Sequence, residues 1–201
     1  MSNRVNVRVT ALVFTTLAAL LTLAARPAAA SLVLALELDE MVRRADHIAV
    51  ADVVSVRSDW DEKHERILTT VQLDVVESWK GPATPATRLT IVQPGGTVGD
   101  ISMVVFGMSQ FKAGERSVLF LRGTMAGAAV LGMAQGKRLV HRDPTGRWMA
   151  EAPDRRGAQF VKAPNASGTG VTPLAPNDAG FRQRPLDEFK RDVQTLMKAS
   201  P

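Results

Sequence analysis

The chain has no cysteine and only three histidines among its 201 residues. Without cysteine, disulfide bonds, thiolate metal ligands and a lipid anchor on an N-terminal cysteine are excluded. The histidines, His47, His64 and His141, are 17 and 77 residues apart, whereas metal sites use closely spaced histidines. We therefore expect no metal and no cofactor, and a fold stabilised by buried apolar surface alone.

Catalytic motifs are also missing, because each segment that resembles one departs from it. Gly107–Phe111 ends in Phe where the G-x-S-x-G turn of a hydrolase needs Gly. Gly132–Arg138 has three residues between its glycines instead of four, and Arg138 stands where a P-loop carries Ser or Thr. The acidic loop Asp59–Arg66 lacks the calcium-loop pattern and contains Lys63. The sequence therefore predicts no catalytic residue, and a protein that is not an enzyme.

Residues 1–30 have the three-part pattern of a secretory signal peptide. A basic start, residues 1–8, precedes the apolar run Val9–Ala25, and Arg26–Pro27 and the small residues Ala28–Ala30 follow. An uncleaved membrane anchor is the alternative, but the run has 17 residues where a spanning helix needs about 20. We predict cleavage after Ala30 and a periplasmic or secreted protein that meets the membrane only during export.

Loss of this segment would also remove three arginines and change the charge. The whole chain has 25 basic and 20 acidic residues and a net charge of +5, whereas residues 31–201 keep 22 basic and 20 acidic residues, a net charge of +2. A charge this small does not make the strongly basic surface that binds nucleic acid. We therefore expect no nucleic-acid partner.

Residues 31–150 are predicted to form one β domain. Alternate residues of Ile67–Trp79 face the same side, which is the period of a strand with one buried face. The unbroken apolar run Ser117–Leu121 predicts a central strand buried on both faces. Other strands are expected at Ile48–Arg57, Arg88–Gln93, Ile101–Phe106, Ala128–Met133, Leu139–His141 and Arg147–Met149. Short strands separated by turn signals predict a mainly β fold, a small barrel or sandwich.

Two helices and a linker complete the predicted organisation. Apolar stripes at helical spacing predict a short helix over residues 37–46 and a C-terminal helix over 186–201. The stripes comprise Leu38, Met41, Val42 and Ala45 in the first helix, and Leu186, Phe189, Val193, Leu196 and Met197 in the second. Between them, residues 151–185 contain five prolines and four glycines, which is typical of a flexible linker. The C-terminal helix either docks on its own barrel or captures a partner.

Blocks of the chain carry a resemblance to known families. They are LDEMVRRADHIAVADVVSV (38–56), ILTTVQLDVVESWKG (67–81), IVQPGGTVGD (91–100), FGMSQFKAGERSVLFL (106–121) and GMAQGKRLV (132–140). Their order resembles a family of uncharacterised exported bacterial proteins. The helix, the strand pair ending in Lys80–Gly81 and the late strand after Gly114–Glu115 are remotely similar to netrin-type and tissue metalloproteinase-inhibitor domains. That resemblance implies an OB-like barrel. The inhibitors use an N-terminal Cys on the catalytic zinc, a mechanism that does not carry over to a start at Ser31.

The function expected from these observations is an exported, non-enzymatic binding module for a protein or an envelope component. Its contact surface is expected at the loop ends, which carry turn glycines and exposed apolar residues. The residues chosen are Trp60, Pro94, Gly95, Gly96, Met108 and Phe111. Three alternatives remain open at this point. These residues only terminate strands, the chain is a proteinase-associated or proteinase-inhibitor-like domain, or it is an enzyme with an unrecognised site.

Overall fold

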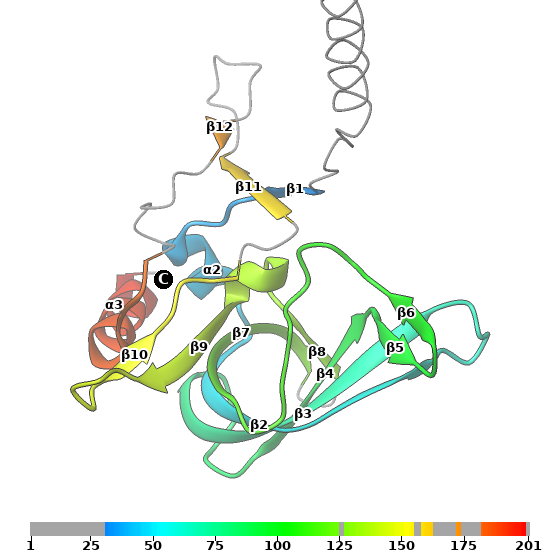
Figure 1. The fold of residues 1–201 in the computed structure, drawn as a ribbon. Coiled ribbons are helices and arrows are strands. Elements are labelled where there is room, and N and C mark those ends of the chain that lie inside the picture. Colours follow the sequence, from blue (N-terminus) through cyan, green and yellow to red (C-terminus); the bar gives the residue numbers. More distant parts are fainter. Residues whose placement is uncertain (1–30, 125–126, 155–157, 163–171, 174–181, 200–201) are drawn as a thin grey trace, which may run out of the picture. The chain divides into compact units, whose positions relative to one another are not determined.

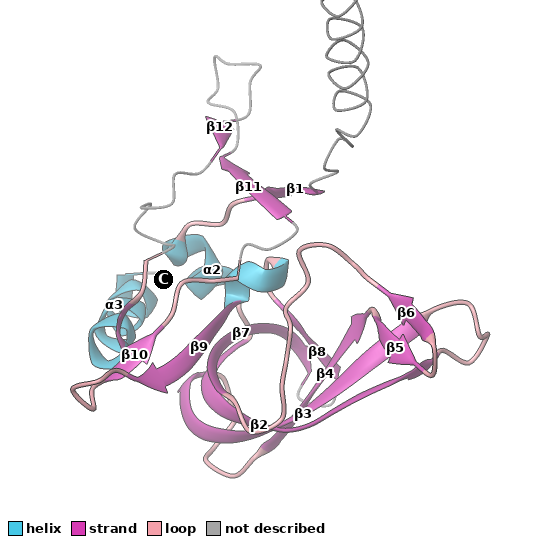
Figure 2. Cartoon of the chain, viewed as in Figure 1, coloured by secondary structure: helices cyan, strands magenta, loops and turns pink. Residues whose placement is uncertain are grey.

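The computed structural model describes residues 31–124, 127–154, 158–162, 172–173 and 182–199. The chain is mainly β, with a large curved sheet, a short helix before it and a longer helix at its C-terminal end (Figure 1, Figure 2). The predicted mainly β fold is confirmed. The predicted signal peptide, residues 1–30, lies outside the described residues. Within the described ranges, no helix combines the length and the apolar composition needed to cross a membrane.

The main sheet curls into a barrel-like form. Its strands are β2 (His47–Trp60), β3 (Ile67–Lys80), β4 (Arg88–Pro94), β7 (Arg116–Thr124), β8 (Gly127–Val130), β9 (Lys137–Arg142), β10 (Trp148–Ala150) and β13 (Arg184–Pro185). Across the sheet they follow the order β13–β10–β9–β7–β2–β3–β4–β8, and β8 pairs with β7 as well. Because a single residue pair, Ile91 with Ala128, joins β4 to β8, the barrel is not fully closed.

Smaller elements surround this sheet. They are β1 (Ser31–Leu34), α2 (Leu38–Arg44), β5 (Gly96–Val98), β6 (Ile101–Met103), the 3-10 helix η1 (Met133–Gly136), β11 (Ala158–Lys162), β12 (Thr172–Pro173) and α3 (Leu186–Ala199). The strand expected at Ile101–Phe106 ends at Met103, because β6 closes a short hairpin with β5 and the chain then turns away. The strand expected at Ala128–Met133 ends at Val130, since Gly132 and Met133 both take positive φ and start η1.

Two apolar cores lie on opposite faces of the central strands. One fills the inside of the curve and contains Leu73, Ile91, Leu119 and Leu121 among others. The second lies between the outside of β2 and β7 and the helices α2 and α3. Every residue of Ser117–Leu121 is fully buried, as the unbroken apolar run predicted. The alternating burial predicted along β3 is confirmed from Ile67 to Val75, where β3 faces the inner core, whereas Trp79 near its end packs in the second core.

A row of charged residues crosses the sheet where Asp52 interrupts the apolar pattern of β2. Asp52 is opposite Asp74 on β3 and Arg116 on β7, and Asp74 is opposite Arg88 on β4. Each aspartate receives two hydrogen bonds from its arginine, at 2.6 and 2.7 Å from Arg116 and at 2.8 and 3.0 Å from Arg88. The hydrogen bonds from Arg88 lower the pKa of Asp74. The two arginines therefore offset the repulsion between the facing carboxylates.

The C-terminal helix α3 docks on the domain itself. Phe189 and Val193 are fully buried, and Leu186, Leu196 and Met197 pack against the same core. These five residues are the predicted apolar stripe, so the stripe is covered by the helix's own domain. In Figure 1 α3 lies beside α2 and β10, and it also contacts β13.

The segment expected to be a flexible linker, residues 151–185, contains paired strands. β11 pairs in parallel with β1 and antiparallel with β12, and β13 pairs with β10. Phe160 on β11 is fully buried beside Val33 and Ala35. The pairing of β11 with β1 and the burial of Phe160 are contacts that the composition of the segment did not indicate.

Candidate functional site

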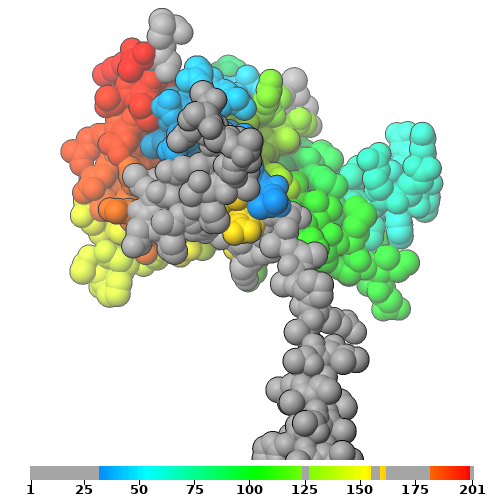
Figure 3. Space-filling view, turned by 90° about the horizontal axis from the view of Figure 1, so that it is seen from above, coloured from blue at the N-terminus to red at the C-terminus, as the bar shows by residue number. Residues whose placement is uncertain are grey.

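The candidate site is a pocket of about 580 Å³ beside the β5–β6 hairpin. Its lining comes from the ends of β2, β3 and β4, from the hairpin, from the loop 104–111 and from Asp154. The lining residues are Val56, Ser58, Thr69, Gln93, Pro94, Gly95, Gly96, Thr97, Ser102, Met103, Val104, Val105, Phe106, Gly107, Met108, Gln110, Phe111 and Asp154. In the space-filling view, β2, β3 and the segment around β5–β6 (cyan and green) project away from α3 (Figure 3).

Five of the six predicted contact residues meet in this pocket: Pro94, Gly95, Gly96, Met108 and Phe111. The sixth, Trp60, does not line it. Trp60 stands at the last position of β2, half-buried, and its ring stacks on His64 with 6.4 Å between centroids. The structure therefore gathers the β4–β5 turn and the loop 104–111, and leaves Trp60 on the neighbouring hairpin loop.

The β4–β5 turn needs glycine because it crosses directly over two hydroxyl groups. Gly95 and Gly96 have φ of 104° and 134°, which residues with a side chain rarely adopt. A Cβ on Gly96 would lie 2.2 Å from Ser58 Oγ and 2.5 Å from Thr69 Oγ1. Those hydroxyls are 2.9 Å apart, and Thr69 Oγ1 donates a hydrogen bond to the Gly95 carbonyl at 2.5 Å. The turn is thus held against β2 and β3, and it positions the hairpin over the pocket.

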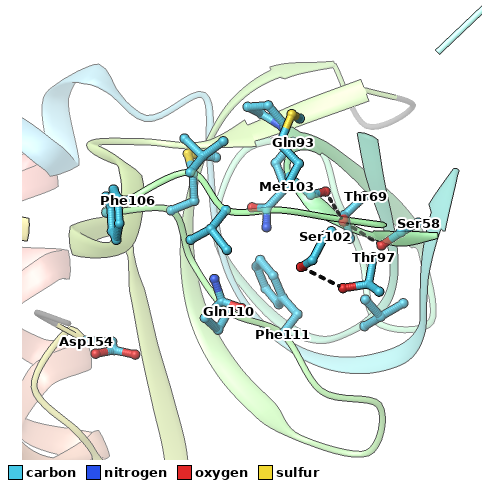
Figure 4. A pocket seen from close by; sticks show the side chains of 18 residues that line it. Ser58, Thr69, Gln93, Thr97, Ser102, Met103, Phe106, Gln110, Phe111 and Asp154 are labelled. Carbon is cyan, nitrogen blue, oxygen red and sulfur yellow. Dashed lines mark hydrogen bonds between the residues drawn. The ribbon is translucent and has the colours of Figure 1, made fainter. Parts of the chain in front are cut away.

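Gln93 provides the polar group at the centre of the pocket. It occupies the last inward position of β4, where its side chain is 8 % exposed. Its Nε2 donates a hydrogen bond to the Ser109 carbonyl at 2.7 Å, and so holds the loop 104–111. Its Oε1 is buried and has no hydrogen-bond partner among the described residues. Figure 4 shows the Gln93 amide among the lining side chains, between Met103 and the loop.

Apolar side chains form most of the wall and continue onto the surface. Met103, Met108 and Phe111 are partly buried in the wall. Val104 is 68 % exposed and Phe106 is 50 % exposed at the rim. The hydroxyls of Ser58, Thr69, Thr97 and Ser102 gather at one end, and Phe106 and Asp154 lie toward the other (Figure 4). The pocket therefore combines an apolar wall, one buried acceptor and a hydroxylated end.

A second hollow of about 340 Å³ adjoins the first, because both are lined by Gln110 and Asp154. Its lining is mostly polar: Ser109, Gln110, Lys112, Glu115, Ala134, Lys137, Leu139, Glu151, Ala152 and Asp154. Lys137 connects the two hollows. Its Nζ donates to Glu115 Oε1 at 2.5 Å and to the Gln110 carbonyl, and it lies 4.6 Å from the ring centroid of Phe111. The two hollows are therefore neighbours, the first with a largely apolar lining and the second with a charged one.

Sequence reasoning missed Gln93, Thr69 and the exposed pair Val104 and Phe106. The sequence did contain one signal for Gln93 and Thr69. Gln93 follows Leu89 and Ile91 at every second position, so the period of two places a polar side chain on the inward face of a strand. A polar residue in an inward position needs a partner or a function. Val104 and Phe106 gave no such signal, because a strand was expected to continue through them.

Among the described residues, no group of three or more His, Asp or Glu side chains is placed to hold a metal ion. Comparison with protein-family models and with curated proteins finds no match for this chain.

Proposed function

We propose that the chain is an exported, non-enzymatic β-barrel module that binds a protein or another envelope component through this pocket. One observation carries the proposal. Loop ends from separate parts of the chain converge on a single pocket, and large apolar side chains at its rim remain in solvent. Exposed apolar groups next to a pocket with a few polar groups are typical of interaction sites.

The composition of the pocket favours binding over catalysis. Among the described residues that line it, Asp154 is the one side chain that could act as a general base, and it lies at the opposite end from the hydroxyls of Ser58 and Thr69 (Figure 4). Its hydroxyls are engaged with one another and with a main-chain carbonyl, as in the Ser58, Thr69 and Gly95 contacts. These groups hold the turn in place, which is a structural task.

The first residue of the protein recovered from its host tests whether it is exported and cleaved. Protein recovered from the envelope or the medium is expected to start at Ser31, because small residues precede the predicted cleavage position. N-terminal sequencing or intact-mass measurement checks this. A chain that retains residues 1–30 and stays in the membrane fraction would contradict cleavage and support the membrane anchor.

Binding is tested by photo-crosslinking at the rim. A photoreactive amino acid in place of Val104 is expected to form a crosslink with one defined envelope component in living cells. The same photoreactive amino acid in place of Arg191, which is exposed on α3, measures the background. Adding Phe106→Ala is expected to reduce the adduct about tenfold, because an exposed aromatic anchor contributes over 1 kcal/mol to binding. Leu34→Ala is the matched control, since Leu34 is 52 % exposed and Phe106 50 %.

The outcomes separate the candidate functions. Equal adducts from the Val104 and Arg191 probes would contradict a binding site at the pocket. An adduct with a secreted proteinase, together with inhibition of that enzyme by the protein, would replace the general binding module with the proteinase-inhibitor-like alternative. Turnover of a substrate that is lost in Ser58→Ala would contradict the non-enzymatic part of the proposal.

A further inference from the structure

We propose that the pocket binds an extended peptide segment of a partner protein, which inserts an apolar side chain and donates a main-chain N–H to Gln93 Oε1. This inference rests on the proposed binding function and names the chemistry of the partner. It starts from the buried acceptor of Gln93.

A buried amide oxygen without a partner is costly, and a bound donor would remove that cost. Gln93 cannot turn its Oε1 toward solvent easily, because its Nε2 is held by the Ser109 carbonyl at 2.7 Å. That contact fixes the amide, and the oxygen stays among the lining residues of the pocket. The protein therefore holds one fixed acceptor beneath the side chains that line the pocket, and these side chains have to part for a donor to reach it.

An extended peptide supplies both a main-chain N–H for the Gln93 acceptor and an apolar side chain for the pocket. Each residue of an extended chain carries an N–H beside a side chain, so an apolar side chain can contact Met103, Met108 and Phe111 while its N–H reaches the acceptor. The neighbouring residues of the peptide would then pass over the exposed Val104 and Phe106. Main-chain hydrogen bonding combined with a side-chain pocket is a common mode of peptide recognition.

The charged residues of the two hollows indicate which flanking residues the peptide carries. Among the residues that the structure describes, Asp154 is the only charged one that lines the pocket. The adjoining hollow adds Glu115, Glu151, Lys112 and Lys137, so the described residues of the two hollows include three acids and two bases. An acidic flank on the peptide would face this carboxylate excess, whereas a basic flank would be complementary. The expected ligand is a short peptide with an apolar residue and a flanking Lys or Arg.

The test uses the exported protein and a displayed library of random 12-residue peptides. Enriched peptides are expected to share an apolar residue flanked by Lys or Arg. Each enriched peptide is then resynthesised with one backbone amide at a time replaced by an ester, which removes the N–H donor. One ester position is expected to weaken binding about tenfold, because it leaves the buried oxygen unsatisfied.

The same ester series on Gln93→Met identifies the acceptor. In this variant the sensitive ester is expected to change affinity less than twofold, since no acceptor remains. Val92→Ala is the matched control, because Val92 is adjacent on β4 and 41 % exposed, outside the pocket lining. It is expected to keep the full tenfold effect. If Gln93→Met fails to fold, the wild-type ester series still tests the need for a donor.

Three results would overturn the inference. The first is a library that yields no enriched peptide while the Val104 probe still traps an envelope component, which rejects a peptide ligand and leaves the proposed function standing. The second is an ester series with no sensitive position. The third is a set of enriched peptides with acidic flanks. Loss of the Val104 adduct itself would instead overturn the proposed function.

Discussion

Replacing Phe189 by alanine is expected to lower the free energy of unfolding by about 3–5 kcal/mol, as for other buried aromatic residues. Phe189 is fully buried and is the centre of the contact between α3 and the sheet. Its ring centroid lies 6.0 Å from that of Trp79 and 6.1 Å from that of Phe120. Loss of the ring would leave a cavity between three elements that are far apart in sequence.

Arg138 increases the expected effect. This arginine is almost completely buried, and its guanidinium lies 4.6 Å from the centroid of the Phe189 ring. Burial, with a smaller contribution from Arg184, lowers the pKa of Arg138 to about 10. The aromatic face is one of the groups that stabilise this buried cation. Phe189→Ala therefore removes apolar packing and a cation–π contact in a single change.

Urea unfolding followed by circular dichroism measures this prediction. Lys198→Ala is the control, because Lys198 is exposed near the end of the same helix, and its expected change is within 0.5 kcal/mol. The Phe189 variant is expected to lose protection from proteolysis in α3 first. A change below 1 kcal/mol would show that α3 contributes little to stability, and would reopen the alternative that this helix captures a partner.

Gly136→Ala is expected to destabilise the protein by about 2–3 kcal/mol, in the upper range for overpacking. Gly136 is buried at the end of η1. A Cβ on this residue would lie 2.3 Å from the Leu131 carbonyl oxygen and 3.1 Å from that of Phe120. Both contacts are with backbone, so no side-chain rotation relieves them, and η1 has to move.

Movement of η1 would also displace the loop 104–111 at the candidate site. The Ala134 N–H donates to the Gly107 carbonyl at 2.9 Å, and Ser109 Oγ donates to the Met133 carbonyl at 3.2 Å. These bonds attach the loop 104–111, which forms one wall of the pocket. We therefore expect Gly136→Ala to weaken the Val104 crosslink as well as to lower the unfolding midpoint.

Gly127→Ala is the matched control for this substitution. Gly127 is exposed at the start of β8, and a Cβ there would have no atom within 4 Å. Its expected effect on stability is within 0.5 kcal/mol. Equal unfolding midpoints for the two variants would show that η1 adjusts at no cost, and would contradict its role in positioning the loop.

The candidate site was predictable in part, for a reason that Gly96 illustrates. Consecutive turn glycines after a strand indicate a backbone with positive φ, and this local signal is present in the sequence. The same sequence gives no sign that the turn crosses over Ser58 and Thr69, which lie far from it along the chain. Trp60, chosen because it stands in a polar loop, does not line the pocket and stacks on His64.

Local patterns by themselves determined the mainly β character, the inward face of β3, the doubly buried β7 and the apolar stripe of α3. They did so because periodicity reports which side of an element is buried. The tertiary structure alone decided what covers each face. It placed α3 over Phe120, brought β11 beside β1, and set Gln93 against a loop that no short-range pattern connects to it. Such contacts join residues distant in sequence, so they follow from the packing of the whole domain and not from any one segment.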